Sequence, residues 1–321
     1  MMLKLILIGV VAGAFFSSTF VLNELMSSQG GHWFWSASLR YVFMWLLLSA
    51  MIGIKSGVGT LAGLCRLFGE HYKFWCIAGG IGFGLFYAPL CFGADHAPGW
   101  VIAATFQFTT VASLIVLALF GETINKKVIA TSVLIFAGVV LTNIGEGLHG
   151  GETGSLTTLL LLGALPCLVA GFCFPIGNQL VWYATRPPST HPLLSKVPHL
   201  TSELMASPLH KVWLLSAGSL PFWVLLGLVV QPPILGVSQA FNALLVALFA
   251  GVIATSLFLY ARSKAANGGQ IAGVDATQAT EVIFSLIGGV LLLGTPMPSV
   301  MSWIGIAMVS VGIVLFCRMQ S

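Results

Sequence analysis

The sequence predicts an all-α integral membrane protein with ten transmembrane helices, arranged as two inverted five-helix repeats. Three observations carry this prediction: long apolar runs recur along the chain, positively charged residues fall in every second loop, and the two halves share a pattern. Of the 321 residues, 57% are hydrophobic and 7% are charged, whereas a soluble domain carries about 25% charged residues. A soluble fold is therefore excluded.

Each predicted helix is an apolar run long enough to cross the hydrocarbon core, which takes about 20 residues. The sixth run contains Pro166 and Pro175, so we expect it to tilt or kink. The first run follows Lys4 as in a signal peptide, but nine further runs indicate an uncleaved helix. The ten runs lie near residues 3–26, 33–54, 74–94, 98–120, 128–145, 156–184, 211–230, 237–261, 269–293 and 299–317.

The Lys and Arg residues give the orientation of these helices. If ten helices alternate, twelve of the thirteen fall on one side of the bilayer: Lys4, Lys55, Arg66, Lys73, Lys126, Lys127, Arg186, Lys196, Lys211, Arg262, Lys264 and Arg318. The opposite loops, near residues 27–32, 95–97, 146–155, 231–236 and 294–298, contain neither residue type. Because positive residues stay on the cytoplasmic side, we predict a multi-pass protein of the cell (cytoplasmic or inner) membrane with both termini in the cytoplasm.

The remaining segments fit this plan. Residues 56–72 carry apolar side chains at helical spacing between charged ones, which predicts an amphipathic helix at the membrane interface. Residues 185–210 contain five prolines and form the predicted cytoplasmic connector. The six cysteines show no metal-binding spacing and are expected to be packing residues. Four tryptophans near run ends are expected to be interfacial anchors: Trp33, Trp35, Trp100 and Trp303.

The two halves of the chain echo each other, which predicts one five-helix repeat in residues 1–147 and another in residues 148–321. The fourth and ninth runs each carry a polar patch about a dozen residues before a terminal Leu/Phe-Gly pair. Five is an odd number, so the second repeat enters the membrane from the opposite side. Inverted repeats of this kind are typical of transporters, whose substrate site lies near the midplane between the halves.

These features resemble the drug/metabolite transporter superfamily. The resemblance lies in the ten-helix plan, the Thr-rich fourth run that ends in Gly121-Glu122, Arg40 within Ser38-Leu-Arg-Tyr, and the ninth-run segment Gln278-Ala-Thr-Glu281. Residues 30–41 and 82–91 are similar to its multidrug-resistance efflux (EmrE/EamA-like) branch. The resemblance implies secondary transport of small organic molecules. The four-helix members of that superfamily carry their membrane glutamate on the first helix, whereas Glu24 here lies near the outer end of the first run, so their mechanism does not transfer directly.

Ionisable residues inside predicted spans are the first candidates for function, because burying them in lipid is costly. Asp275, Gln278 and Glu281 lie about one turn apart on the ninth run, with Glu281 close to the midplane. We expect them to share one polar face, either as a substrate or proton site or as a structural network. Arg40 and Glu24 lie at similar depth on adjacent helices, and we expect them to form a structural ion pair, with a role in the substrate site as the alternative.

Further polar residues complete the candidate site. Gln107, Thr105 and Thr109 form the matching patch on the fourth run, and Tyr87 and Asn178 are weaker candidates for lining a cavity. No HExxH, GxSxG, Walker or Gly-x-Gly-Asp motif is present, so we expect no enzyme activity, no cofactor and no metal.

The expected function is proton-coupled efflux of drugs or metabolites by alternating access, with a cationic or amphipathic molecule as substrate and no nucleic acid as partner. A carrier for metabolite uptake or exchange is the first alternative. A non-transporting scaffold or receptor is the second.

Overall fold

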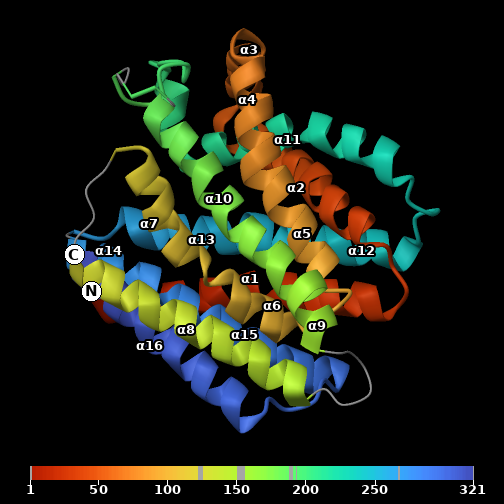
Figure 1. The fold of residues 1–321 in the computed structure, drawn as a ribbon. Helices are drawn as coiled ribbons and strands as arrows, with labels where there is room; N and C mark the ends of the chain where they lie inside the picture. Colours follow the sequence, from red (N-terminus) through yellow and green to blue (C-terminus); the bar gives the residue numbers. More distant parts are fainter. Residues whose placement is uncertain are drawn as a thin grey trace.

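The computed structural model is a bundle of helices that describes residues 2–121, 126–149, 156–187, 191–192, 194–266 and 268–320 (Figure 1). Within these ranges there is no β-strand, and ten segments are long and apolar enough to cross a membrane. The predicted all-α class with ten spans is confirmed, and each predicted run agrees with an observed segment to within a few residues. Glu122, at the end of the predicted fourth run, lies outside the described residues.

The first half contains five spans and one shorter helix. The spans are α1 (Met2–Ser28); α2 (Trp33–Ser56); α4 (Tyr72–Gly79) with η1 (Gly80–Leu85) and α5 (Phe86–Gly93); α6 (Gly99–Phe106) with α7 (Thr109–Leu119); and α8 (Lys126–His149). The helix α3 (Val58–Glu70) lies between the second and third spans, where the amphipathic pattern places it. Its Leu64 and Leu67 are buried, whereas Arg66 and Glu70 are exposed and form an ion pair of 3.3 Å.

The second half repeats the plan, and a connector that contains the short helix η3 (Glu203–Ala206) joins its first span to its second. Its spans are α9 (Leu156–Thr158) with η2 (Leu159–Ala164) and α10 (Leu165–Ala184); α11 (Pro208–Val230); α12 (Val237–Val246) with η4 (Ala247–Ala254) and α13 (Thr255–Ser263); α14 (Gly268–Asp275) with η5 (Ala276–Ala279), α15 (Thr280–Gly288) and η6 (Gly289–Leu293); and α16 (Val300–Gln320).

The helices widen into π-turns near two of their prolines. Proline lacks an N–H and its ring collides with the carbonyl four residues earlier, and a π-turn relieves that collision by lengthening the hydrogen-bonded loop. The turn η2 leads into Pro166, where we predicted a distortion, and η1 ends four residues before Pro89. The π-turn η4 lies in a segment without proline, and there the Thr255 hydroxyl donates to the Ala250 carbonyl at 3.1 Å.

The packing contacts between the two halves follow a symmetric pattern. The first span, α1, packs against η4 and α13 of the eighth span and α15 of the ninth, and the sixth span, α10, packs against η1 and α5 of the third and α7 of the fourth. In the same way α2 packs on α12 and η4, and α11 packs on α4 and η1. Each contact has a counterpart with the halves swapped. This supports the inverted five-helix repeats, which remain a prediction.

One crossing between the halves depends on glycine. The third and sixth spans meet at Gly82 and Gly177, where a Cβ on Gly82 would lie 2.9 Å from the Gly177 Cα. Real Cβ atoms do not approach a backbone atom that closely. Only glycine therefore permits this close packing of two membrane helices.

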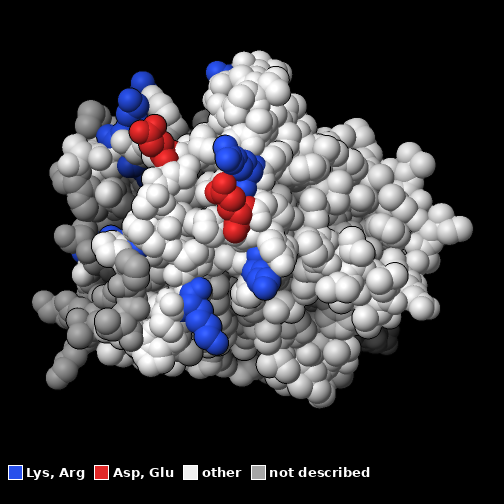
Figure 2. Space-filling model, turned by 90° about the horizontal axis from the view of Figure 1, so that it is seen from above, with Lys and Arg blue, Asp and Glu red and all other residues white. Residues whose placement is uncertain are grey.

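The chain ends, the surface charges and the tryptophans at span ends bear on how the bundle lies in a membrane. Both chain ends lie at the same side of the bundle in Figure 1, as an even number of spans requires. Seen from above that view, the charged side chains gather on the half nearer the termini, and the half nearer α12 shows none (Figure 2). The expectation that Trp100 is an interfacial anchor is wrong, because its side chain is fully buried in the core. The indole of Trp35 does lie at a span end, where its Nε1 donates to the Pro233 carbonyl at 2.7 Å.

Candidate functional site

The polar patches of the fourth and ninth spans both lie where the helix is interrupted. The fourth span breaks between α6 and α7, at Gln107 and Phe108. The ninth narrows to the 3₁₀ turn η5 between α14 and α15. The two spans touch each other through α6 and α15. A break in a membrane helix exposes polar backbone groups. Such a break is tolerated only where other parts of the protein surround it or where it lines a cavity.

The patch of the fourth span is largely occupied by contacts within the protein. Thr105 is fully buried, donates to the Val101 carbonyl at 2.8 Å and accepts a hydrogen bond of 2.7 Å from the Asn143 amide. The Thr109 hydroxyl donates to the Gly171 carbonyl of α10 at 3.0 Å. Gln107 is 3% exposed at the break itself. Thr105 and Thr109 therefore hold the fourth span against its neighbours.

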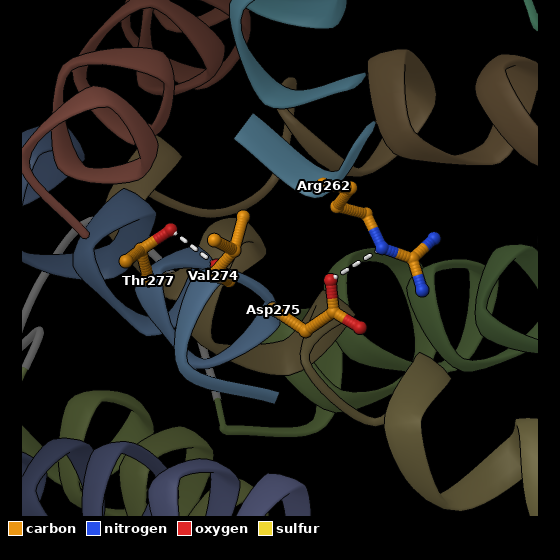
Figure 3. Close-up of polar contacts among 4 residues, drawn as sticks. All are labelled: Arg262, Val274, Asp275 and Thr277. Carbon is orange, nitrogen blue, oxygen red and sulfur yellow. Dashed lines mark hydrogen bonds and ion pairs between the residues drawn. The ribbon is translucent and has the colours of Figure 1, made fainter. Parts of the chain in front are cut away.

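Asp275 lies at the end of α14 and is half-buried. Its carboxylate pairs with Arg262 of α13, with 2.9 Å between Oδ1 and Nε, and both side chains are partly exposed (Figure 3). The Thr277 hydroxyl, drawn in the same view, donates to the Val274 carbonyl at 2.6 Å. Gln278 follows in η5 and is half-buried. The predicted polar face is thus divided, because Asp275 has a partner of its own near one end of the span.

Helix α1 packs closely against the ninth span through small residues. A Cβ on Gly9 would collide with the Thr277 side chain, and one on Gly13 with the Thr280 hydroxyl. Thr280 in turn donates to the Thr277 carbonyl at 2.6 Å. This contact places α15, which begins at Thr280, against α1 and brings Glu281 into the interior of the bundle.

Arg40 lies inside the bundle against two tyrosines. Its guanidinium carbon is 4.2 Å from the centre of the Tyr87 ring and 5.6 Å from that of Tyr41, and its Nη1 lies 3.4 Å from the Thr19 hydroxyl. The Tyr87 hydroxyl is held by Asn23, whose Nδ2 lies 3.0 Å away. Only 8% of the Arg40 side chain is exposed, and its Nε is buried without a hydrogen-bond partner.

The predicted ion pair between Arg40 and Glu24 is wrong. Glu24 instead accepts the Gly99 N–H at 2.8 Å and the Thr295 hydroxyl at 2.7 Å. A carboxylate at the first residue of a helix is favoured by the unpaired N–H groups and the helix dipole there. Glu24 therefore fixes the start of α6 and the loop after η6.

Glu281 is buried without such a partner. It is 9% exposed and interacts electrostatically with Arg40. Among the described residues its carboxyl group forms neither a hydrogen bond nor an ion pair within 4.0 Å. Arg40 and Glu281 are thus two opposite charges that lie in the same interior region and do not touch.

The sequence reasoning missed two polar residues, and the place of a third, Asn178, in a cavity stays a prediction. Asn143 and Glu146 lie on α8 and are buried; Glu146 fell one residue beyond the predicted fifth run, which ended at 145. A count of every polar residue between the apolar runs and their flanks would have found both. Asn178 was a candidate cavity residue, but its side chain is exposed and donates to the Phe174 carbonyl of its own helix at 3.1 Å. No group of three His, Cys, Asp or Glu residues suited to a metal is found in the described part of the chain.

Comparison with known proteins identifies the family to which this chain belongs. A family model, EmrE, described as "Putative multidrug resistance efflux transporter", matches residues 3–321. The chain belongs to this family. The family is one of membrane transporters in the drug/metabolite transporter superfamily, so this protein is a membrane transporter and not an enzyme. The resemblance seen in the sequence is confirmed.

Individual relatives cover most of this family member. The chain is 33% identical over 333 residues to "Uncharacterized protein YjlA" of Bacillus subtilis (strain 168). The matched region covers 98% of this chain and 94% of the relative. It is 33% identical over 274 residues to the "Uncharacterized 42.1 kDa protein in intracellular alkaline protease 3'region" of Shouchella clausii, across 82% of this chain and 65% of that protein. A crystal structure of another protein covers 99% of this chain and 97% of its own with a TM-score of 0.59 and 16% identity, which supports the fold alone.

Proposed function

We propose that this family member is a secondary active transporter that moves a small organic molecule by alternating access and couples the movement to protons through Glu281. It would lie in the cell membrane with both termini in the cytoplasm. Its two five-helix halves would rock about a site between the fourth and ninth spans. The family description favours export of drugs or metabolites.

The observation that carries the proposal is the position of Glu281. It lies where α15 packs against α1 and α6, is almost fully buried, and forms no ion pair in the described ranges. An isolated carboxylate is poorly tolerated away from water, so the group holds a proton until an aqueous path or a substrate charge stabilises the anion. A buried carboxyl group that has no structural partner is suited to carry a proton between the two faces of a transporter.

The test is Glu281→Gln in protein reconstituted into liposomes. Glutamine keeps the shape of the protonated acid, so the variant should fold and bind substrate but lose accumulation or extrusion driven by a pH gradient, while substrate exchange persists. Glu146→Gln is the matched control, because Glu146 is a second buried glutamate on a different span and should keep coupled transport. Full pH-driven transport by a well-folded Glu281→Gln protein would remove Glu281 from the mechanism.

Uptake is the second candidate, and one observation favours it. The guanidinium of Arg40 lies in the same interior region with an unpartnered Nε, which suits an acidic substrate rather than a cation. The sign of the charge that the site accepts decides whether a proton and the substrate exchange or travel together.

A further inference from the structure

Arg40 has more hydrogen-bond donors than its surroundings have acceptors. A guanidinium group carries five N–H donors and no acceptor. The structure gives it the Thr19 hydroxyl at 3.4 Å and a contact with the Tyr87 hydroxyl, and its Nε is enclosed without a partner. Among the described residues no carboxylate lies within 4.0 Å of it. A buried arginine without a paired anion is costly, because its loss of hydration is not compensated by a counter-charge.

The side chains around Arg40 enclose its guanidinium group, but none of them compensates its charge as a carboxylate would. Tyr87 and Tyr41 present their rings to the guanidinium, and a cation–π contact is weaker than a bidentate pair with a carboxylate. The Tyr87 hydroxyl exchanges hydrogen bonds with Asn23. Cys91 and Glu281 are the other titratable groups that interact with Arg40. The result is a buried cation that lies against two aromatic rings and has one unpaired donor, its Nε.

We propose that Arg40 binds the carboxylate of an organic acid, and that this acid is the transported substrate. The proposal rests on the transport function proposed above and names its substrate class. The planar guanidinium matches a carboxylate through two parallel hydrogen bonds, and the rings of Tyr41 and Tyr87 suit an aromatic or otherwise apolar body on the same molecule. It replaces the cationic substrate that the sequence alone led us to expect.

Glu281 then senses whether the acid is bound. Of the elements packed against α15, α6, η5 and η6 carry no titratable side chain, and α1 carries Lys4 near its start and Glu24, which is engaged at Gly99. Arg40 is the charge that acts on Glu281. When a carboxylate neutralises Arg40, the anion of Glu281 loses its stabilising partner and takes up a proton.

The acid and the proton therefore bind together. Each favours the other by the same factor, because linkage between two sites is reciprocal. An alternating-access carrier with this property moves the two in the same direction, and an inward proton gradient would drive uptake of the acid. A cationic substrate would instead compete with the proton and exchange for it.

The experiment measures equilibrium binding of three probes of one shape to the purified full-length protein. The probes are 3-phenylpropionate, 3-phenylpropylamine and 3-phenylpropanol, which are an acid, an amine and an alcohol. For the wild type we expect 3-phenylpropionate to bind at least tenfold more tightly than the alcohol. We also expect its affinity to rise as pH falls from 8 to 6, where the probe stays ionised, by up to tenfold for each pH unit.

Variants assign these effects to residues. Glu281→Gln should bind the acid with an affinity that does not change with pH, whereas the control Glu146→Gln should keep the pH dependence. Arg40→Gln should lose the preference for the acid over the alcohol. If Arg40→Gln does not fold, Arg40→Lys keeps the charge without the planar fork and should bind the acid more weakly than wild type with the same pH dependence.

Three outcomes would overturn the inference: tighter binding of the amine than of the acid, binding of none of the probes, or an unchanged preference for the acid in the folded Arg40 variant. A protein that prefers the amine and couples it to protons in liposomes keeps the proposed transport function and loses the acid site. Loss of coupling in both Glu281→Gln and Glu146→Gln proteins would instead count against the assigned role of Glu281.

Discussion

Glu24 joins three parts of the chain through one carboxylate, and its replacement tests the partner assignment directly. It lies on α1, accepts the N–H of Gly99 at the start of α6 at 2.8 Å, and accepts the hydroxyl of Thr295 after η6 at 2.7 Å. Glu24→Ala removes both hydrogen bonds and the favourable charge at the helix start.

The expected loss of stability is about 2 kcal/mol. Hydrogen bonds to charged groups in soluble proteins contribute roughly 1.5–3 kcal/mol each, but bonds between membrane helices average roughly 0.6 kcal/mol, because the unfolded state in the membrane also finds partners. The membrane value applies to Glu24, which is only half-buried. Two such bonds together with the helix-dipole contribution of roughly 0.3–1 kcal/mol give the total.

A double-mutant cycle separates the assigned partner from the rejected one. Unfolding of the purified protein in mixed micelles is measured for Glu24→Ala, Thr295→Val and the double variant. We expect a coupling energy of about 0.6–1.7 kcal/mol between these two positions. A second cycle pairs Glu24→Ala with Arg40→Gln, and there the two effects should add to within about 0.5 kcal/mol, as for residues that share no partner. Strong coupling of Glu24 to Arg40, with none to Thr295, would refute the reasoning.

Three further predictions test orientation, packing and the Asp275 pair. With Cys65, which is exposed, replaced by serine, Ile234→Cys should react with a membrane-impermeant thiol reagent added outside intact cells, and Lys196→Cys should not; the reverse pattern would invert the topology. Gly82→Leu should abolish folded protein on size-exclusion chromatography, because the new side chain meets the backbone of Gly177, whereas Gly59→Leu, with nothing within 4 Å of its Cβ position, should elute as wild type. Asp275→Asn should cost under about 1 kcal/mol of unfolding free energy, because the pair with Arg262 is partly exposed; it should keep transport, and loss of transport by the folded variant would place Asp275 in the site.

The spans were predictable because their signal is local. A run of apolar residues that matches the bilayer thickness predicts a helix whatever its neighbours are, and the ten predicted runs match the ten observed segments. The same locality explains a failure. Trp100 lies near a run end, which is typical of an interfacial anchor, but α6 starts deep in the protein, where Glu24 holds its first residue. Depth in the assembled bundle does not follow from distance along the sequence.

The partners of the polar residues could not be predicted, because they depend on which way each side chain faces. Similar depth on adjacent helices suited an ion pair of Arg40 with Glu24, but depth does not fix rotation about the helix axis. The polar stripe of the ninth span was projected on a uniform α-helix. The 3₁₀ turn η5 advances about 120° per residue in place of 100°, so Asp275 faces Arg262 while Glu281 faces the interior.

The charged residues inside the spans now divide by what they contact. Glu24 has two hydrogen bonds, and Asp275 has an arginine beside it. Glu146 lies in the last turn of α8, a helix that packs chiefly on α16, and His149 acts on it from the same turn. Structural contacts account for the first two. Glu146 has a buried Oε2 without a hydrogen-bond partner, and it differs from Glu281 in its position in the last turn of a span.

Arg40 and Glu281 remain, and no structural contact accounts for keeping both charges in the interior. A pair retained only for stability would be expected to touch, because separated buried charges each pay for their lost hydration without the compensating contact. Two opposite charges are held apart, on α2 and on α15 at the interrupted ninth span, as the proposed acid and proton sites require. That arrangement fits the carrier proposed above, which would hold a charged molecule and a proton in turn, better than it fits a scaffold.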